Sequence, residues 1–258
     1  MSPELFAQIE ISKHSAPARV FPVQNELGEK LWIKLAVKPK NKFWHRVQKI
    51  AALLLKRDIL NPTVCQGGIE ALKAEAKHLK ALNTRGFLVP LALYFGPDWM
   101  ALSDIGNSLP HAPEPLEKTL CLAARELAHL HKANGWHGNA VARNFVIDAK
   151  YNLGMIDFEE ELENIMPLEA RQARDIILFL SSAVSLAENK MPEITMAYLN
   201  EEPPLIIASE IAKILKLLSP VLSLLRIWNK NLGRDLRRIL QVETYLHQIS
   251  VYKGNKNA

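Results

Sequence analysis

The sequence has little cysteine: only Cys65 and Cys121 occur among 258 residues, and they lie far apart. This number and spacing exclude a disulfide framework and a cysteine-based metal site. We expect both to be buried thiols in a reducing compartment, because a free cysteine usually packs as a small apolar side chain.

Long apolar runs are also missing. No run reaches the roughly 18 residues that suggest a membrane-spanning helix. The first fifteen residues contain no apolar segment of the kind found in signal peptides. These absences predict a cytoplasmic protein that reaches a membrane, if at all, as a peripheral protein at its inner face.

An excess of acidic residues is absent as well, since the net charge is +5 and the pI is about 9.1. The balance favours anionic partners such as nucleotides, anionic glycolipid or membrane surfaces, or nucleic acid. Residues 38–49, KPKNKFWHRVQK, place Phe43 and Trp44 among basic residues, which suits an anionic membrane surface. Nucleic acid is not an expected partner, because only this one segment resembles a stacking platform. The oligomeric state is not determined by the sequence.

The first part of the chain reads as mainly β-structure. Residues 5–37 are rich in β-formers, and residues 18–37 predict two strands joined by a tight turn at Gly28. Apolar residues then recur at nearly 3.6-residue spacing from Ile69 to Leu82, which predicts a helix that ends at Gly86. The other elements expected here are a basic helix over 38–57, a breaker zone over 58–68, and strands over 87–95 and 98–105 around Gly96–Pro97.

The second part reads as mainly helical, after an exposed proline-rich linker. The expected helices are 116–133, 167–187, 205–225 and 231–249, with a hairpin formed by NFVID and LGMIDF between the first two. We expect 205–225 to be a core helix kinked at Pro220. The pattern predicts a two-lobed α+β protein with a cleft between the lobes, divided into residues 1–104, 105–115 and 116–258.

Two charged residues in apolar surroundings suggest a functional pair. Lys34 lies inside LWIKLAV, and Glu75 lies beside the apolar stripe of the 69–82 helix. An unpaired buried charge is costly, so each residue needs a partner of opposite sign. A strand lysine paired with a helix glutamate holds nucleotide phosphates in kinases. The alternative is an ion pair with only a structural role.

The segment NGWHGNAVARNFVID, residues 134–148, resembles a phosphoryl-transfer loop. In it, Asn144 follows Asn139 by five residues, and the hairpin would bring Asn144 and Asp157 to one end of two strands. An amide oxygen and a carboxylate oxygen suit Mg²⁺. The alternatives are that His137 is a buried structural histidine, that Asn144 caps a turn, and that Asp157 is a turn residue.

Several segments together resemble the bacterial small-kinase branch of the protein-kinase-like superfamily. This branch includes lipopolysaccharide core-sugar and Kdo kinases and aminoglycoside phosphotransferase-like proteins. The resemblance covers roughly residues 10–187 and rests on LKAEAKHLKALNTRGFLVP, WMALSDIG, LAARELAHLHKANGWHGNAVARNFVID, LGMIDFEE and ARQARDIILFLSSAV. It implies a protein-kinase-like fold with a small β-rich N-lobe, one key helix and a mainly helical C-lobe.

The resemblance also implies ATP and Mg²⁺ as cofactors and assigns roles to single residues. Lys34 would bind the nucleotide phosphates, Glu75 would orient Lys34, and backbone groups from Met100 through Leu102 to Asp104 would contact adenine. Asn144 and Asp157 would hold Mg²⁺, His137 would brace the catalytic loop, and Asp175 would bind the loop backbone.

Two departures from the family pattern bear on activity. Asn139 stands where the family usually has the aspartate that accepts the substrate proton, and Glu159 is a conceivable substitute. The expected phosphate-covering segment, residues 11–20, contains no glycine. Its contacts would have to come from Lys13, His14, Ser15 or Arg19. Despite these departures, the resemblance as a whole predicts an Mg²⁺/ATP-dependent phosphotransferase acting on an envelope glycolipid or sugar hydroxyl. The alternative is a pseudokinase that acts as a nucleotide-binding or regulatory module.

Overall fold

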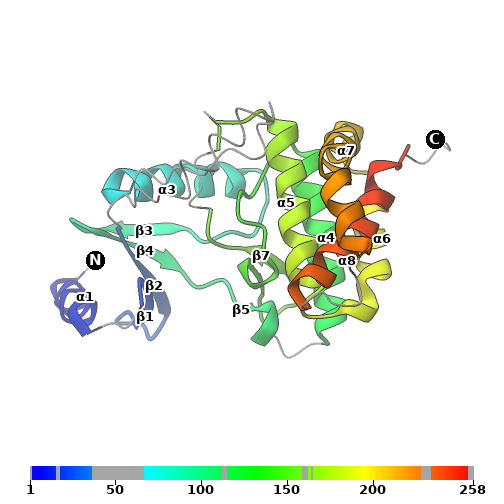
Figure 1. Cartoon of the computed structure of the whole chain (residues 1–258). Helices are drawn as coiled ribbons and strands as arrows, with labels where there is room; N and C mark the ends of the chain where they lie inside the picture. The colour runs from blue at the N-terminus through cyan, green and yellow to red at the C-terminus, as the bar shows by residue number, and fades with distance from the viewer. Residues whose placement is uncertain are drawn as a thin grey trace.

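The computed structural model describes residues 2–15, 18–36, 67–111, 115–158, 162–163, 165–227 and 234–254. Helices predominate, and two small antiparallel sheets accompany them, so the predicted α+β class is confirmed. Figure 1 shows a strand-rich part, from α1 to β4, beside a helical part, from β5 to α8. This division agrees with the expected two-lobed layout, while the domain boundaries themselves stay a prediction.

The larger sheet forms the centre of the strand-rich part. Its strand order is β1-β2-β4-β3, with all neighbours antiparallel. The strands are β1 (Val20–Gln24), β2 (Lys30–Leu35), β3 (Ala92–Phe95) and β4 (Trp99–Ser103). The turn between β1 and β2 lies where the sequence predicts it, and Gly28 adopts a φ of 76° there. Residues 87–91 were expected in the third strand but lie outside β3.

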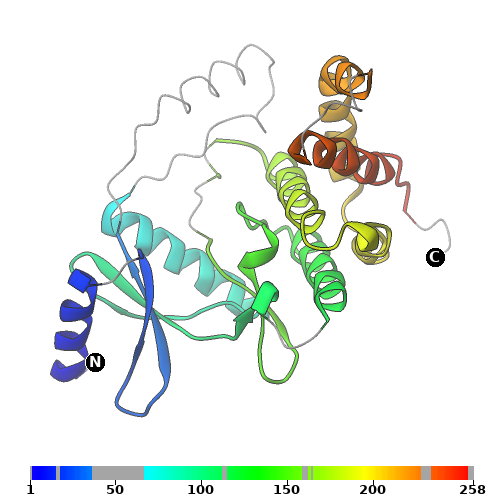
Figure 2. The same ribbon diagram turned by 60° about the horizontal axis from the view of Figure 1, so that its bottom comes forward.

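Alternation along the central strands gives the sheet two buried faces. Ile33 and Ala101 pack on one face against α1 (Pro3–Ser15), which buries Leu5 and Ile9. Met100 and Leu102 point to the opposite face, in the same core as the buried leucines of α3 (Gly68–Thr84). Figure 2 shows α1 and α3 as separate helices beside the sheet.

The β-rich interpretation of residues 5–37 is wrong for its first third. Residues 3–15 form α1, and the alternating pattern begins only at β1. Leu5 and Ile9 are four residues apart, which places both side chains on one face of a helix. This helix packs the two buried side chains against the sheet.

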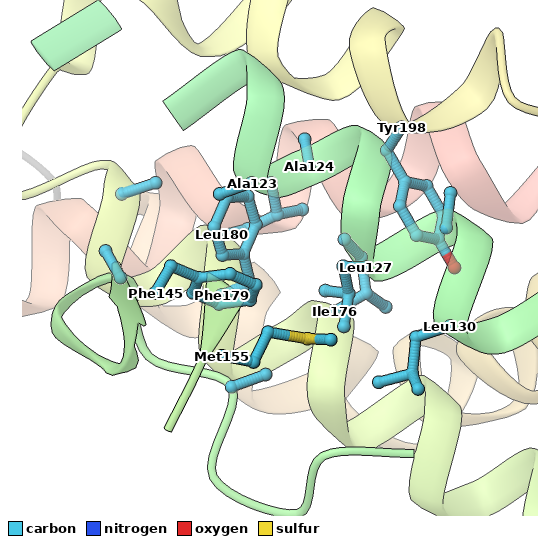
Figure 3. Close-up of a cluster of buried hydrophobic side chains, with 14 of the residues drawn as sticks. Ala123, Ala124, Leu127, Leu130, Phe145, Met155, Ile176, Phe179, Leu180 and Tyr198 are labelled. Carbon is cyan, nitrogen blue, oxygen red and sulfur yellow. The ribbon is translucent and has the colours of Figure 1, made fainter. Parts of the chain in front are cut away.

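The helical part confirms the predicted hairpin and the four predicted helices. The hairpin strands are β6 (Phe145–Ile147) and β7 (Leu153–Met155). The helices are α4 (Leu116–Lys132), α5 (Leu168–Ala183), α7 (Leu205–Ile227) and α8 (Arg234–Ser250), with α6 (Met191–Leu199) as a further one that the sequence analysis missed. Figure 3 shows the core in which side chains from α4, α5 and α6 meet Phe145 and Met155 of the hairpin.

Part of the predicted linker forms a strand and a buried turn. Asn107 and Ser108 form β5, which pairs with β6, and Leu109 is buried in the core. Gly106 permits this approach, since it has a φ of 131° and a Cβ there would lie 2.2 Å from the Ile147 carbonyl oxygen. The expectation of an exposed linker is therefore wrong for Leu109, whereas Asn107 is exposed as expected.

Within the described residues, no helix is long and apolar enough to cross a membrane. The helix α7 instead buries Ile207 and Ile211 in the core, which confirms its predicted packing. Cys121 is a half-buried free thiol, less buried than expected. The predicted helix over 38–57, Cys65, and the basic segment with Phe43 and Trp44 lie outside the described residues.

Candidate functional site

Lys34 and Glu75 form the buried pair that the sequence predicts. The alternation of β2 points Lys34 to the α3 side of the sheet, and Glu75 projects from the inner face of α3. Both side chains are almost fully buried, and Lys34 Nζ lies 2.8 Å from Glu75 Oε1. The lysine is thus fixed in place by a charged partner on a neighbouring element.

The same ammonium also contacts the helical part of the protein. Lys34 Nζ lies 2.8 Å from Asp157 Oδ1, so one lysine joins a carboxylate from α3 and a carboxylate from the segment after β7. Asp157 has a φ of 70°, in the left-handed region that residues other than glycine rarely adopt. Such strained backbone is concentrated at functional sites.

The surroundings of Asp157 favour its charged form. Burial by itself raises the pKa of this carboxyl, but the charge of Lys34 and hydrogen bonds from Lys34 and Asn139 outweigh it. The net result is a pKa below the ordinary value. Asp157 is therefore a carboxylate at neutral pH, as a metal ligand must be.

The loop that carries Asn139 is held by α5. Asp175, which is fully buried, accepts hydrogen bonds from the backbone N–H groups of His137 (2.6 Å) and Gly138 (2.7 Å). Gln172, one turn earlier, donates to the carbonyl oxygens of His131 and Gly135. These contacts agree with the role that the resemblance implies for Asp175, and they give the loop a defined position.

His137 is a structural support of the loop in this geometry. Its ring is fully buried and stacks on Phe158 with a centroid distance of 4.3 Å. Burial lowers the pKa of His137 below its usual value, so the ring is neutral. The ring Nδ1 accepts a hydrogen bond from the backbone N–H of Asn139 at 3.3 Å.

Asn139 lies between the two predicted metal ligands. Its side-chain Nδ2 donates to Asp157 Oδ2 at 3.1 Å, and its backbone carbonyl oxygen accepts a hydrogen bond of 2.8 Å from Asn144 Nδ2. Asn144 is buried at the end of a short 3-10 helix (Ala142–Asn144), and its carbonyl oxygen accepts from the Ile156 N–H beside Asp157. The hairpin therefore brings Asn144 and Asp157 to one end, as predicted.

The chemistry of Asn144 and Asp157 fits Mg²⁺. Amide and carboxylate oxygens are hard ligands, and Mg²⁺ is commonly held by one or two carboxylates together with substrate phosphates. Among the described residues, no group of three or more His, Cys, Asp or Glu side chains could hold a metal. A metal here would thus need oxygen ligands from a phosphate or from water.

The adenine contacts remain a prediction, and the strand pairing limits which backbone groups could make them. The backbones of Met100 and Leu102 are paired with β2 on one side and β3 on the other. Asp104 lies beyond this ladder, and its carboxylate accepts a hydrogen bond from Trp32 Nε1. Backbone groups for adenine are therefore expected from Asp104 onward rather than from the strand itself.

The segment expected to cover the phosphates does not do so. Lys13, His14 and Ser15 end α1, which covers the sheet face opposite to the one where Lys34 points. Lys13 pairs with Glu10 and Asp98, and Arg19 donates to the Leu35 carbonyl oxygen. Contacts from Lys13 to a phosphate at Lys34 are excluded, because the sheet separates them.

Sequence reasoning missed two features near the site. His78 lies one turn after Glu75 and is packed between Trp136 and Phe158, at centroid distances of 4.6 and 5.3 Å. Arg174 donates to the Gly138 carbonyl oxygen. The position of His78 at i+3 from Glu75 is the one hint that it faces the loop.

The comparisons with known proteins leave the assignment to the site's own geometry. No protein-family model and no curated protein matches the chain. Among solved structures, the chain is similar to the choline kinase LicA from Streptococcus pneumoniae, with 10% sequence identity and a TM-score of 0.46. The likeness covers 95% of this chain and 99% of that chain. It is too distant to identify a reaction or a substrate.

Proposed function

We propose that this protein binds ATP with Mg²⁺ and transfers a phosphoryl group to the hydroxyl of a sugar or envelope glycolipid. The observation that supports this is the position of Lys34, 2.8 Å from both Glu75 and Asp157. A lysine held by a helix glutamate is how kinases contact nucleotide phosphates. Asp157 adds a candidate metal ligand beside the same ammonium.

Each residue of the site has a separate task in this proposal. Lys34 donates to phosphate oxygens, and Glu75 keeps its ammonium in place. Asn144 and Asp157 would hold Mg²⁺, which neutralises phosphate charge when bound. Asn139 orients the acceptor hydroxyl without accepting its proton. The general-base catalysis that is missing here is typically worth about 10²–10⁴-fold in rate.

The acceptor class rests on the sequence. The family resemblance and the net charge of +5 favour an anionic glycolipid or sugar. The basic segment 38–49, which would contact such a surface, lies outside the described residues. The acceptor is therefore to be identified by measuring phosphate transfer to sugars and glycolipids.

The second candidate is a pseudokinase that binds a nucleotide and regulates a partner. The hydrogen bond from Asn139 Nδ2 to Asp157 Oδ2 favours it, because the amide is engaged with the site's own carboxylate. Glu159, the conceivable substitute base, lies outside the described residues.

The test is ATP consumption and phosphate transfer to sugar and glycolipid acceptors, in the presence of Mg²⁺, by the wild-type protein and by Asn139→Asp. The enzyme proposal expects slow turnover in the wild type and a gain on the order of 10²-fold in the variant. Binding of ATP without turnover in either protein would favour the pseudokinase. Absence of ATP binding would contradict both candidates.

A further inference from the structure

Asn139 connects both candidate metal ligands in addition to occupying the position of the missing base. Its backbone carbonyl oxygen accepts a hydrogen bond from Asn144 Nδ2, and its side-chain amide donates one to Asp157 Oδ2. Lys34 already occupies the other oxygen of the same carboxylate, Oδ1. Both oxygens of Asp157 are therefore engaged by donors from the protein itself.

The three charged side chains that meet at Lys34 sum to a single negative charge. Glu75 and Asp157 contribute two negative charges, and Lys34 contributes one positive charge that contacts both. Asn139 and Asn144 are neutral. An aspartate at position 139 would instead place a second carboxylate within hydrogen-bond distance of Asp157. The wild-type protein and that variant differ by one negative charge, whatever the rest of the chain contributes.

The affinity of an oxygen site for a divalent cation rises with the number of charged ligands. We infer that Asn139 keeps free divalent metal off this site, so that the metal enters only together with the phosphates of a nucleotide. The phosphates supply the negative charge and the oxygens that the protein lacks. This inference rests on the proposed function, and it concerns the order of binding at the same site.

The test uses Mn²⁺ as the probe, because carboxylate and carbonyl oxygens bind Mn²⁺ and Mg²⁺ alike. Electron paramagnetic resonance measures free Mn²⁺ in titrations of the full chain, with and without ATP, and the Mn²⁺ that the same ATP concentration binds without protein is subtracted. The variants are Asn139→Asp, Asn139→Ala as the neutral control, and Asn144→Asp. The last adds the same negative charge at a candidate metal ligand. A melting scan checks that each variant is folded.

The inference expects the wild-type protein to bind Mn²⁺ at least about tenfold more tightly with ATP than without it. In the absence of ATP, Asn139→Asp or Asn144→Asp should bind Mn²⁺ at least about tenfold more tightly than the wild type. Asn139→Ala should bind it less tightly than Asn139→Asp.

Three results would overturn the inference. The first is wild-type binding of Mn²⁺ alone as tightly as with ATP, which would leave the proposed function standing. The second is an Asn139→Ala affinity equal to that of a folded Asn139→Asp, since the added charge would then have no effect. The third is a lack of Mn²⁺–ATP binding by the wild type, which would contradict the proposed function as well.

Discussion

Lys34 and Asp157 lie 123 positions apart in the sequence, yet their side chains form an ion pair of 2.8 Å. The contact joins the strand-rich part to the helical part at the point where Glu75 also meets the lysine. One ammonium thus holds two carboxylates from different parts of the chain.

Replacing the lysine should destabilise the protein strongly. Lys34→Met removes the ammonium that Glu75 and Asp157 share, and breaking a buried ion pair typically costs about 3–5 kcal/mol. Urea unfolding should show this loss. The matched control is Lys73→Met on the exposed face of α3, where the pair with Glu70 should contribute less than about 1 kcal/mol. Equal losses for the two variants would contradict the buried pair.

Removing the carboxylate that holds the loop should also lower stability. Asp175→Ala leaves the N–H groups of His137 and Gly138 without their buried acceptor. Since hydrogen bonds to charged groups contribute about 1.5–3 kcal/mol each, we expect a loss of about 3 kcal/mol or more. Ser181→Ala, on the exposed side of the same helix, should change the unfolding free energy by less than about 0.5 kcal/mol. A small loss in Asp175→Ala would show that other contacts position the loop.

His78 should make stability depend on pH on the acid side. Burial lowers the pKa of His78 from 6.5 to about 4, so the unfolded chain binds a proton in this range that the folded chain does not. The contribution is complete above pH 6.5 and is lost as the pH falls towards 4. Between pH 7 and 5 the loss should be about 2 kcal/mol.

The variant His78→Phe tests this effect, because phenylalanine keeps an aromatic ring next to Trp136 and Phe158 without a titrating group. Denaturant unfolding at pH 7 and 5 should show a smaller loss of stability in the variant than in the wild type. The same slope in both proteins would assign the pH dependence to other residues.

The sequence predicted the parts of the site that have local signals. Lys34 and Glu75 stand in apolar surroundings, where a charge requires a partner, so their local sequence contexts and the known lysine–glutamate pair of kinases predict their pairing. The hairpin with Asn144 and Asp157 was predicted from two short strand patterns around a turn. The helices of the second part were visible in their 3.6-residue periodicity.

The contacts that the sequence could not predict depend on tertiary packing. The ion pair between Lys34 and Asp157 needs both parts of the chain in place. The hydrogen bond from Asn139 to Asp157 depends on a rotamer of a loop residue. Helix α1 has only Leu5 and Ile9 as buried residues, so its periodicity is too weak to distinguish it from the strands that follow. The strand β5 exists because β6 offers an edge.

The most direct test of the nucleotide site is the melting temperature of the wild-type protein with ATP and Mg²⁺ together, with each alone, and in Asp157→Ala. The account predicts a rise that requires both ligands, since ligand at about 100 times its Kd stabilises the folded state by about 2.7 kcal/mol. The rise should disappear in Asp157→Ala while that variant remains folded. No rise in the wild type at saturating ATP and Mg²⁺, or an equal rise in Asp157→Ala, would contradict it.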